Sequence, residues 1–100
     1  IASGGGAKGR TWRQIQADML GMPVYTTKTE EEACLGAAIL AAVGCGTYGD
    51  IEEACRAVVK LNEHPVEPIA QNVERYRIQQ QIFRELYCKV KDLYPKIHRE

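Results

Sequence analysis

A glycine-rich run near the start of the sequence carries the residues best suited to chemistry. Gly4, Gly5 and Gly6 follow a short apolar stub and precede Lys8 and Arg10. Glycine lacks a Cβ and adopts positive φ readily, so backbone N–H groups in such a run can converge on an anion where the following helix presents its own unpaired N–H groups. Lys8 adds the positive charge of its ammonium group, and Arg10 adds a planar guanidinium whose N–H donors can bind two phosphate oxygens. The run is typical of a phosphate-binding turn, with a plain tight turn into a helix as the alternative.

The same glycines also fit part of a dinucleotide-binding pattern. Gly4, Gly6 and Gly9 satisfy G-x-G-x-x-G, and Glu30 lies near the position of the carboxylate that binds ribose. Against this interpretation, Glu30 belongs to an acidic cluster suited to a helix N-terminus, and no third βαβ element follows. A P-loop is disfavoured more strongly, because Lys8 precedes the last glycine and no G-K-[ST] follows.

The elements that position this run are predicted from periodicity. Apolar residues at three- and four-residue spacing predict a helix that is capped by Thr11 and stopped by Gly21. Trp12 lies in its core-facing stripe, and Asp18 lies on the face predicted to be solvated. Residues 23–27 are short and rich in β-formers, which indicates a strand. With the N-terminal stub this gives an α/β unit, and since the stub is shorter than a typical strand of about five residues, we expect the chain to belong to a longer polypeptide.

Three further helices are predicted downstream. A capping box from Thr29 to Glu32 opens a helix of small apolar residues that runs to Val43, and its composition indicates packing on several sides. A second capping box at residues 50–53 opens a helix with a regular apolar stripe to residue 59. A connector or edge strand at 62–68 follows. A long helix with a wide buried face then runs from 72 to 94, where Pro95 ends it.

Composition excludes several function classes. The chain has 100 residues, of which 45% are hydrophobic, and 13 basic residues balance 13 acidic ones. The length and hydrophobic content predict one small globular unit. A net charge of zero gives the chain no net positive electrostatic field that would attract nucleic acid or an anionic membrane. Without an apolar stretch of bilayer length we expect a cytoplasmic protein. Four cysteines without a C-x-x-C pair predict free, buried thiols, and His64 and His98 lack ligand-like spacing to them, so no metal site is predicted.

Taken in order, the motifs resemble the C-terminal domain of FGGY carbohydrate kinases, xylulokinase-like members especially. The resemblance covers most of the chain and weakens after about residue 60. It rests on the segments Gly4-Gly5-Gly6-Ala7-Lys8, Trp12-Arg13-Gln14-Ile15, Ala17-Asp18, Leu20-Gly21, Pro23-Val24 and Glu31-Glu32-Ala33-Cys34-Leu35-Gly36-Ala37-Ala38, with Ala41.

This resemblance implies an α/β fold, namely the ribonuclease H-like domain of the sugar kinase, actin and heat-shock ATPase type, which here is helix-rich with few short strands. Residues 1–100 would form the C-terminal part of that domain, with the sugar-binding domain outside this chain. The family places its Gly-Gly-Ala turn against ATP, which carries over to Gly5, Gly6 and Ala7. Lys8 and Arg10 flank that turn and are the candidate cationic contacts, and Mg²⁺ would be held mainly by residues outside the chain.

Two functions are weighed from these observations. In the first, the chain supplies nucleotide contacts to an ATP-dependent kinase that phosphorylates a sugar or polyol hydroxyl; it holds no catalytic residue and is inactive alone. In the second, it is a non-catalytic α/β module that binds a nucleotide or a protein. Since the predicted sheet edge and apolar helix need cover, we also expect self-association.

Overall fold

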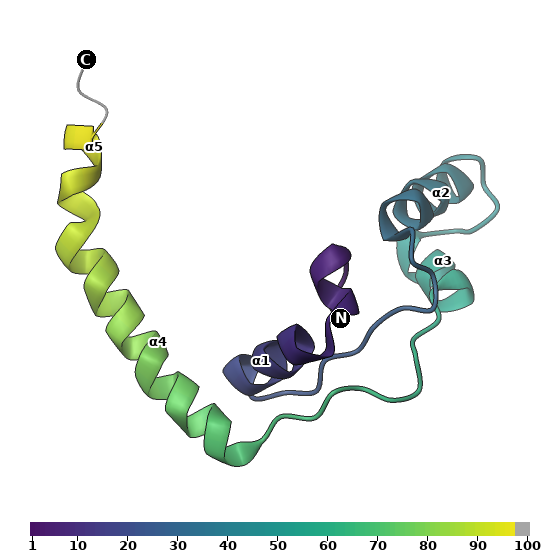
Figure 1. Cartoon of the computed structure of the whole chain (residues 1–100). Coiled ribbons are helices and arrows are strands. Elements are labelled where there is room, and N and C mark those ends of the chain that lie inside the picture. Colours follow the sequence, from purple (N-terminus) through teal and green to yellow (C-terminus); the bar gives the residue numbers. More distant parts are fainter. Residues whose placement is uncertain (98–100) are drawn as a thin grey trace.

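A computed structural model describes residues 1–97 as a series of helices joined by extended segments (Figure 1). His98, considered above as a metal ligand, lies outside the described residues. The α4 helix lies on one side of the molecule, α2 and α3 lie on the other, and α1 lies between them. The elements in chain order are η1 (Gly5–Lys8), α1 (Arg10–Leu20), α2 (Glu32–Gly44), α3 (Ile51–Val58), α4 (Ala70–Val90), η2 (Lys91–Leu93) and α5 (Tyr94–Ile97).

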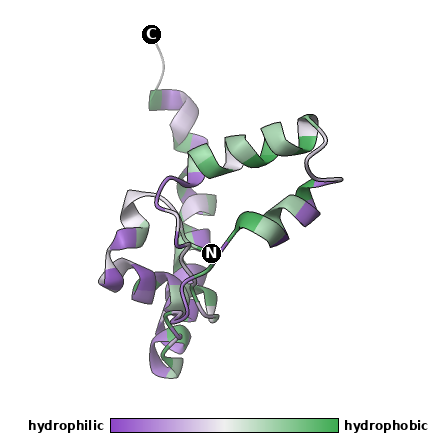
Figure 2. Cartoon of the chain, turned by 90° about the vertical axis from the view of Figure 1, so that its right-hand side faces the viewer, coloured by the Kyte–Doolittle hydropathy of each residue, from purple (hydrophilic) through white to green (hydrophobic). Residues whose placement is uncertain are grey.

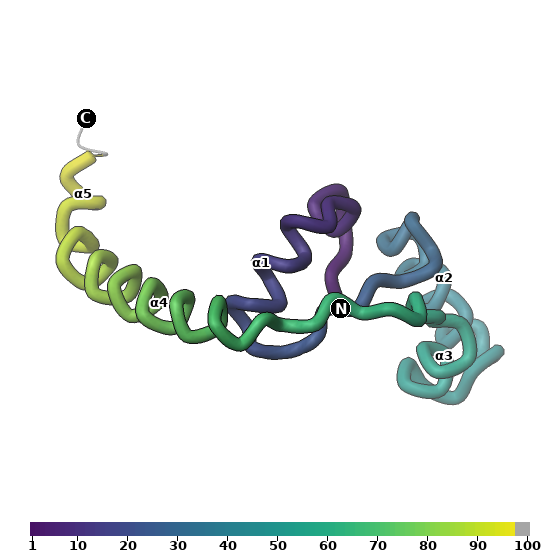
Figure 3. The backbone as a smooth tube through the Cα atoms, turned by 60° about the horizontal axis from the view of Figure 1, so that its bottom comes forward, coloured from purple at the N-terminus to yellow at the C-terminus, as the bar shows by residue number. Residues whose placement is uncertain are grey.

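Three extended segments pair at isolated points between these helices. Ala2 bridges Thr26 in parallel, and the stretch after α1 pairs antiparallel with the connector before α4, through Val24 with Val66 and Thr27 with Leu61. Figure 3 traces these two stretches along the middle of the molecule. The expected connector or edge segment is therefore confirmed, and the architecture is helix-rich with only short β pairing. Prolines beside Val24 and Val66 lack N–H donors, which limits the pairing to isolated bridges.

The α1 helix begins one residue before the predicted cap. Its N-cap is Gly9, and the N–H of Arg13 donates to the carbonyl of Gly9 at 3.1 Å. Thr11 already lies in the first turn, because η1 leads directly into α1, so the prediction that Thr11 caps the helix is wrong. The predicted stop is confirmed: Gly21 has a φ of 66°, and its N–H donates to the carbonyl of Ala17 at 2.8 Å.

Asp18 is buried, which corrects its predicted place on a solvated face. It is 2% exposed, and its carboxylate accepts hydrogen bonds from the backbone N–H of Ile69 (2.8 Å), from Nδ2 of Asn72 (2.9 Å) and from Nε2 of Gln14 (2.9 Å). The Ile69 N–H is the main reason that the pKa of Asp18 lies below its ordinary value; burial opposes this effect, and Asn72 and Gln14 add to it. Asp18 thereby joins α1 to the start of α4.

The apolar faces predicted to be buried are largely exposed in this chain. Trp12 is 51% exposed and Leu20 is 62% exposed, whereas the buried residues of α1 are Ala17 and Asp18. The α4 helix has no buried residue. The predicted periodicity is present, but α4 leans away from α1 over most of its length (Figure 1), so neither stripe is fully covered.

The two middle helices differ in how they begin. The predicted capping box at Thr29 does not form: α2 begins at Glu32, and the Glu32 carboxylate accepts from the hydroxyl of Thr27 at 3.3 Å. The second box forms in part: the N–H of Glu53 donates to Asp50 at 2.8 Å as predicted, but the Glu53 carboxylate accepts from the N–H of Gly49 at 2.8 Å and not from that of Asp50.

The α2 helix packs against α3 and is otherwise open, with Ile39 as its buried residue. Figure 2 shows that α2 is hydrophobic along most of its length. The prediction that it is packed on several sides is therefore not met within this chain. The same openness corrects the prediction of buried thiols: the cysteines are free, but Cys34, Cys45 and Cys88 are exposed.

The C-terminal helix is divided near its end. It begins at Ala70, two residues before the predicted start, and ends at Val90, after which η2 and the short α5 continue to Ile97. Pro95 lies inside α5, so the prediction that it ends the helical segment is wrong. Proline is tolerated in the first turn of a helix, because the N–H groups there have no intrahelical partner. Among the described residues, no helix has the length and apolar character needed to cross a membrane.

The buried Asp18 carboxylate predicts a pH-dependent stability. Because its folded pKa is depressed, its contribution is fully present above the unfolded-state value near 3.8 and is lost as the pH falls through the lower folded-state value. We expect Asp18→Asn to lower the thermal midpoint by several degrees at pH 7, with the difference from the unmodified chain shrinking below about pH 4. Circular dichroism melts measure this; the exposed Glu63→Gln is the matched control, and a constant difference from pH 7 to pH 2 would contradict the assignment.

Candidate nucleotide-side site

The glycine run forms a compact turn that leads into α1. Gly4 has a φ of 83°, a conformation that favours glycine, and its carbonyl accepts from the N–H of Ala7 at 3.1 Å. The N–H of Gly9 donates to the carbonyl of Gly6 at 3.3 Å, which closes η1 onto the N-cap of α1. Upstream, the N–H of Ala2 donates to the carbonyl of Tyr25 at 2.8 Å. The turn is thus tied to the central extended segment.

The three consecutive glycines lie in different surroundings. Gly4 is required by its positive φ. A Cβ at Gly6 would lie 3.3 Å from both Cδ1 and Nε1 of Trp12, so the Trp12 indole covers this position. A Cβ at Gly5 would meet no atom within 4 Å, and its φ is not in the left-handed region. Neither the backbone nor the packing of the chain therefore explains Gly5, whose surface is open to an approaching ligand.

A polar pocket of about 330 Å³ lies against one side of the turn. Lys8 and Arg13 bring positive charge to it, and Glu30 and Glu32 bring negative charge. Lys8 Nζ lies 3.9 Å from a carboxylate oxygen of Glu30, with both side chains more than two-thirds exposed, so this ion pair is weak. The remaining lining residues are Ala2, Gly4, Ala7, Thr26, Thr27 and Asn62.

Arg10 lies apart from this pocket. With Arg13, His64 and Glu67 it lines a neighbouring pocket of about 350 Å³ beside the connector. The structure therefore separates the two predicted cationic contacts, Lys8 and Arg10, and places Arg13 at both pockets.

Arg13 was not among the predicted contacts, although its position in the sequence is informative. It lies three residues after Arg10 on α1, a spacing that puts both side chains on one helix face. Its Nε is buried and has no hydrogen-bond partner among the described residues. A basic residue between two polar pockets makes this end of α1 suited to an anion that contacts both.

The arrangement offers anion binding rather than proton transfer. Glycine backbone, two or three cationic side chains and the start of an 11-residue helix suit a phosphate. In residues 1–97, His, Cys, Asp and Glu side chains do not form a group of three or more that would hold a metal ion. The exposed Cys45 has a pKa below its ordinary value, chiefly because of the hydroxyl of Thr47 at 3.3 Å, but it lies on the loop after α2 and outside both pockets.

Comparison with known sequences identifies the protein family that this part of the chain matches. Residues 1–45, which contain the turn, α1 and α2, match the C-terminal domain of the FGGY family of carbohydrate kinases. Over these residues the chain belongs to this family.

Individual relatives extend the match over most of the chain. A xylulose kinase from Bacillus subtilis is 36% identical over 93 residues, which are 93% of this chain and 18% of that protein. A xylulose kinase from Staphylococcus epidermidis is 39% identical over 90 residues, covering 90% of this chain and 18% of the relative. An autoinducer-2 kinase from Photorhabdus laumondii is 33% identical over 88 residues, covering 88% and 16% respectively. The chain thus spans less than a fifth of the length of these relatives.

The different environments of Gly5 and Gly6 predict different responses to one substitution. Gly6→Val should displace the Trp12 indole, lower the thermal midpoint and shift the emission of Trp12, which is the single tryptophan of the chain. Gly5→Val, whose side chain meets open space, should leave both quantities close to those of the unmodified chain. Tryptophan fluorescence during thermal unfolding measures both. Equal effects from the two variants would refute the assignment of Gly6 to packing and Gly5 to an open surface.

Proposed function

We propose that this chain supplies part of the nucleotide side of an ATP-dependent carbohydrate kinase, within a C-terminal domain of the ribonuclease H-like type. The observation that carries the proposal is the open glycine: Gly5 is needed neither for a positive φ nor for packing, yet it lies between two glycines that are. Close approach of a ligand to the backbone explains it. The match to the FGGY family of carbohydrate kinases supports ATP as that ligand.

Each predicted contact receives a role in this proposal. Gly5 presents its open backbone to the nucleotide, while Gly6, packed under Trp12, and the buried Ala7 complete the turn that positions it. Lys8 exchanges its weak pairing with Glu30 for a phosphate oxygen. An exposed ion pair contributes little to stability, so this exchange costs little. Arg10, in the neighbouring pocket, contacts another part of the same nucleotide.

Arg13 extends the predicted set of contacts. Its side chain lines both pockets, so its guanidinium is suited to an anion that spans them. Mg²⁺ accompanies the ATP phosphates in this proposal, and its protein ligands lie in other parts of the kinase. Phosphoryl transfer depends mainly on positioning and on neutralising phosphate charge, and these residues suit that task.

We propose a sugar or polyol hydroxyl as the phosphate acceptor. The relatives described above are named xylulose kinase and autoinducer-2 kinase, and the xylulose kinases have the higher identities, which favours xylulose as the first substrate to test. The base that activates the acceptor hydroxyl is assigned to none of residues 1–97, so we expect the 100-residue chain alone to be inactive.

A chimeric kinase tests the proposal directly. In it, this chain replaces the matching segment of the Bacillus subtilis xylulose kinase, and Gly5→Asp and Gly5→Asn are compared in that background. A carboxylate at Gly5 would oppose the ATP phosphates, whereas the isosteric amide adds the same bulk without charge. We expect Gly5→Asp to raise the KM for ATP at least about tenfold, Gly5→Asn to raise it less, and the KM for the sugar to stay constant.

Three outcomes would contradict the proposal. An unchanged KM for ATP and unchanged turnover in Gly5→Asp would remove the turn from the nucleotide site. Protection of the chain from thermal unfolding by NADH, with none from ATP, would support the dinucleotide alternative at Gly4, Gly6 and Gly9. A folded chimera that binds ATP and phosphorylates no sugar would instead support the non-catalytic module.

A further inference from the structure

The pocket that contains Arg10 has walls from two distant parts of the chain. Arg10, Arg13 and Gln14 belong to the first five residues of α1, and the facing wall is residues 64–67 of the connector before α4. We name residues 64–67 the connector wall. Gln14 and Glu67 are 53 positions apart in the sequence. The shape of the pocket therefore depends on the contacts that hold the connector wall beside α1.

The Gln14 side chain joins these two walls directly. Its Nε2 donates to the backbone carbonyl of Glu67 at 2.9 Å and to Oδ1 of Asp18 at 2.9 Å. A side-chain amide nitrogen carries two N–H groups, so both donors of Gln14 are used. The two partners are a carbonyl and a carboxylate, which accept hydrogen bonds, and this fixes the orientation of the amide. Gln14 thus connects the connector wall to the buried carboxylate.

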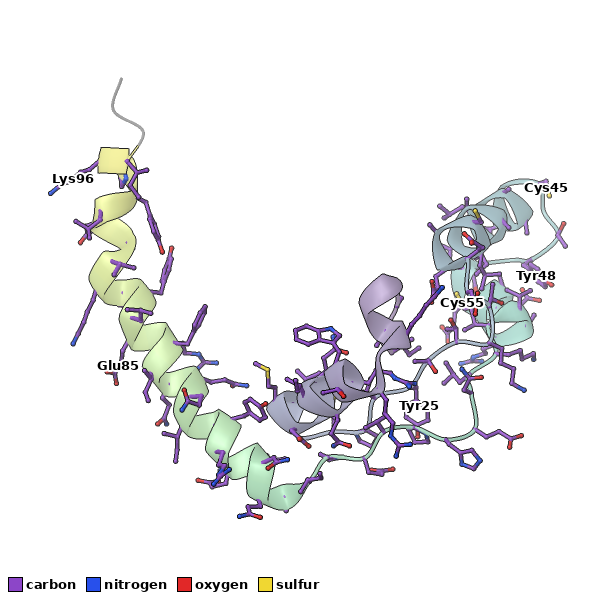
Figure 4. All side chains as sticks on the ribbon, viewed as in Figure 1. Tyr25, Cys45, Tyr48, Cys55, Glu85 and Lys96 are labelled. Carbon is purple, nitrogen blue, oxygen red and sulfur yellow. The ribbon has the colours of Figure 1, made fainter. Side chains whose placement is uncertain are left out.

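The opposite edge of the connector is held by the central extended segment, whose Tyr25 is labelled in Figure 4. The backbones of Val24 and Val66 exchange two N–H to carbonyl bonds of 2.9 Å, and the N–H of Asn62 donates to the carbonyl of Thr26 at 2.8 Å. These bonds fix the connector to the central segment. Among the described residues, the hydrogen bond that joins α1 directly to the connector wall is that of Gln14.

We infer that Gln14 is a positioning residue for the nucleotide, an inference that rests on the proposed binding of ATP at the glycine turn. By holding the carbonyl of Glu67, Gln14 sets the distance between the connector wall and the guanidinium groups of Arg10 and Arg13. A small displacement of the groups around a bound substrate is costly even when the displaced group lies away from the reacting atoms. Gln14 acts through Glu67, since both of its donors are already used within the chain.

Asn72 offers a matched control, because it binds the same carboxylate from outside both pockets. Its Nδ2 donates to Oδ2 of Asp18 at 2.9 Å. Asn72→Leu removes that bond, whereas Gln14→Met leaves Oδ1 paired with the N–H of Ile69 at 2.8 Å. Asn72→Leu should therefore lower the thermal midpoint at least as much as Gln14→Met does, but without releasing the connector wall.

Steady-state kinetics of the chimeric kinase separate positioning from general stability. We expect Gln14→Met to raise the KM for ATP about three- to tenfold, which corresponds to the loss of about one hydrogen bond, and to leave the KM for the sugar constant. Asn72→Leu should change the KM for ATP by less than about twofold. Equal rises in the two variants would show that loosening of the whole junction is responsible, and the inference would be wrong.

Hydrogen–deuterium exchange of the same chimera, without ATP, measures the connector wall itself. Peptides that cover residues 60–67 should exchange faster in Gln14→Met than in the parent chimera, because the Val66 amide is protected by its pairing with Val24. In Asn72→Leu the faster exchange should be confined to residues 69–73. Unchanged exchange over residues 60–67 in Gln14→Met would mean that Gln14 does not hold the wall, even if the KM for ATP rises.

The Gly5→Asp chimera distinguishes this inference from the proposal on which it rests. If Gly5→Asp raises the KM for ATP and Gln14→Met does not, the turn binds the nucleotide and Gln14 has no positioning role. If neither variant changes the KM for ATP, the nucleotide does not bind at the turn, and both ideas are wrong.

Discussion

The buried carboxylate of Asp18 is the interaction on which the arrangement of the helices depends. It accepts hydrogen bonds from Ile69 and Asn72, residues 51 and 54 positions away, and so fixes the start of α4 against α1. Gln14 strengthens the same junction, since its amide donates both to Asp18 and to the carbonyl of Glu67 at 2.9 Å. A buried carboxylate without such donors would be costly, so the junction is favourable only while all its partners stay in place.

The same helix carries the candidate site at its other end. The glycine turn leads into α1 through Gly9, and Arg13 lies one turn into the helix, so the direction of α1 sets where the turn and its cations lie. The Asp18 junction thus orients the site without lying in it. In the turn, Gly4 is required by its positive φ and Gly6 by its packing against Trp12, whereas Gly5 faces open space. Because Gly5 has no structural reason to be glycine, the proposal that the turn binds phosphate rests on more than the presence of glycine.

Local patterns predicted the helices well because their causes are local. The left-handed stop at Gly21 and the N-cap at Asp50 depend on neighbours within four residues, and both are as expected. The role of Asp18 was not predictable, because its partners are more than fifty residues away and a lone Asp on a helix gives no sign of them. The start of α2 was mispredicted for a related reason: the Glu32 carboxylate accepts from Thr27 instead of capping the helix at Thr29.

The remaining errors concern burial, and they share one cause. Periodicity identifies which face of a helix is apolar, but it does not identify what covers that face. At α1 the covered positions are the small Ala17 and the hydrogen-bonded Asp18, while the large Trp12 packs across Gly6 and stays half exposed. The polar junction therefore fixes α1 against the start of α4, and apolar surfaces of α2 and of α4 stay exposed on either side of it. In a chain built this way, burial of the hydrophobic stripes must come from contacts between molecules or with further polypeptide, because α1, α2 and α4 do not bury them against one another.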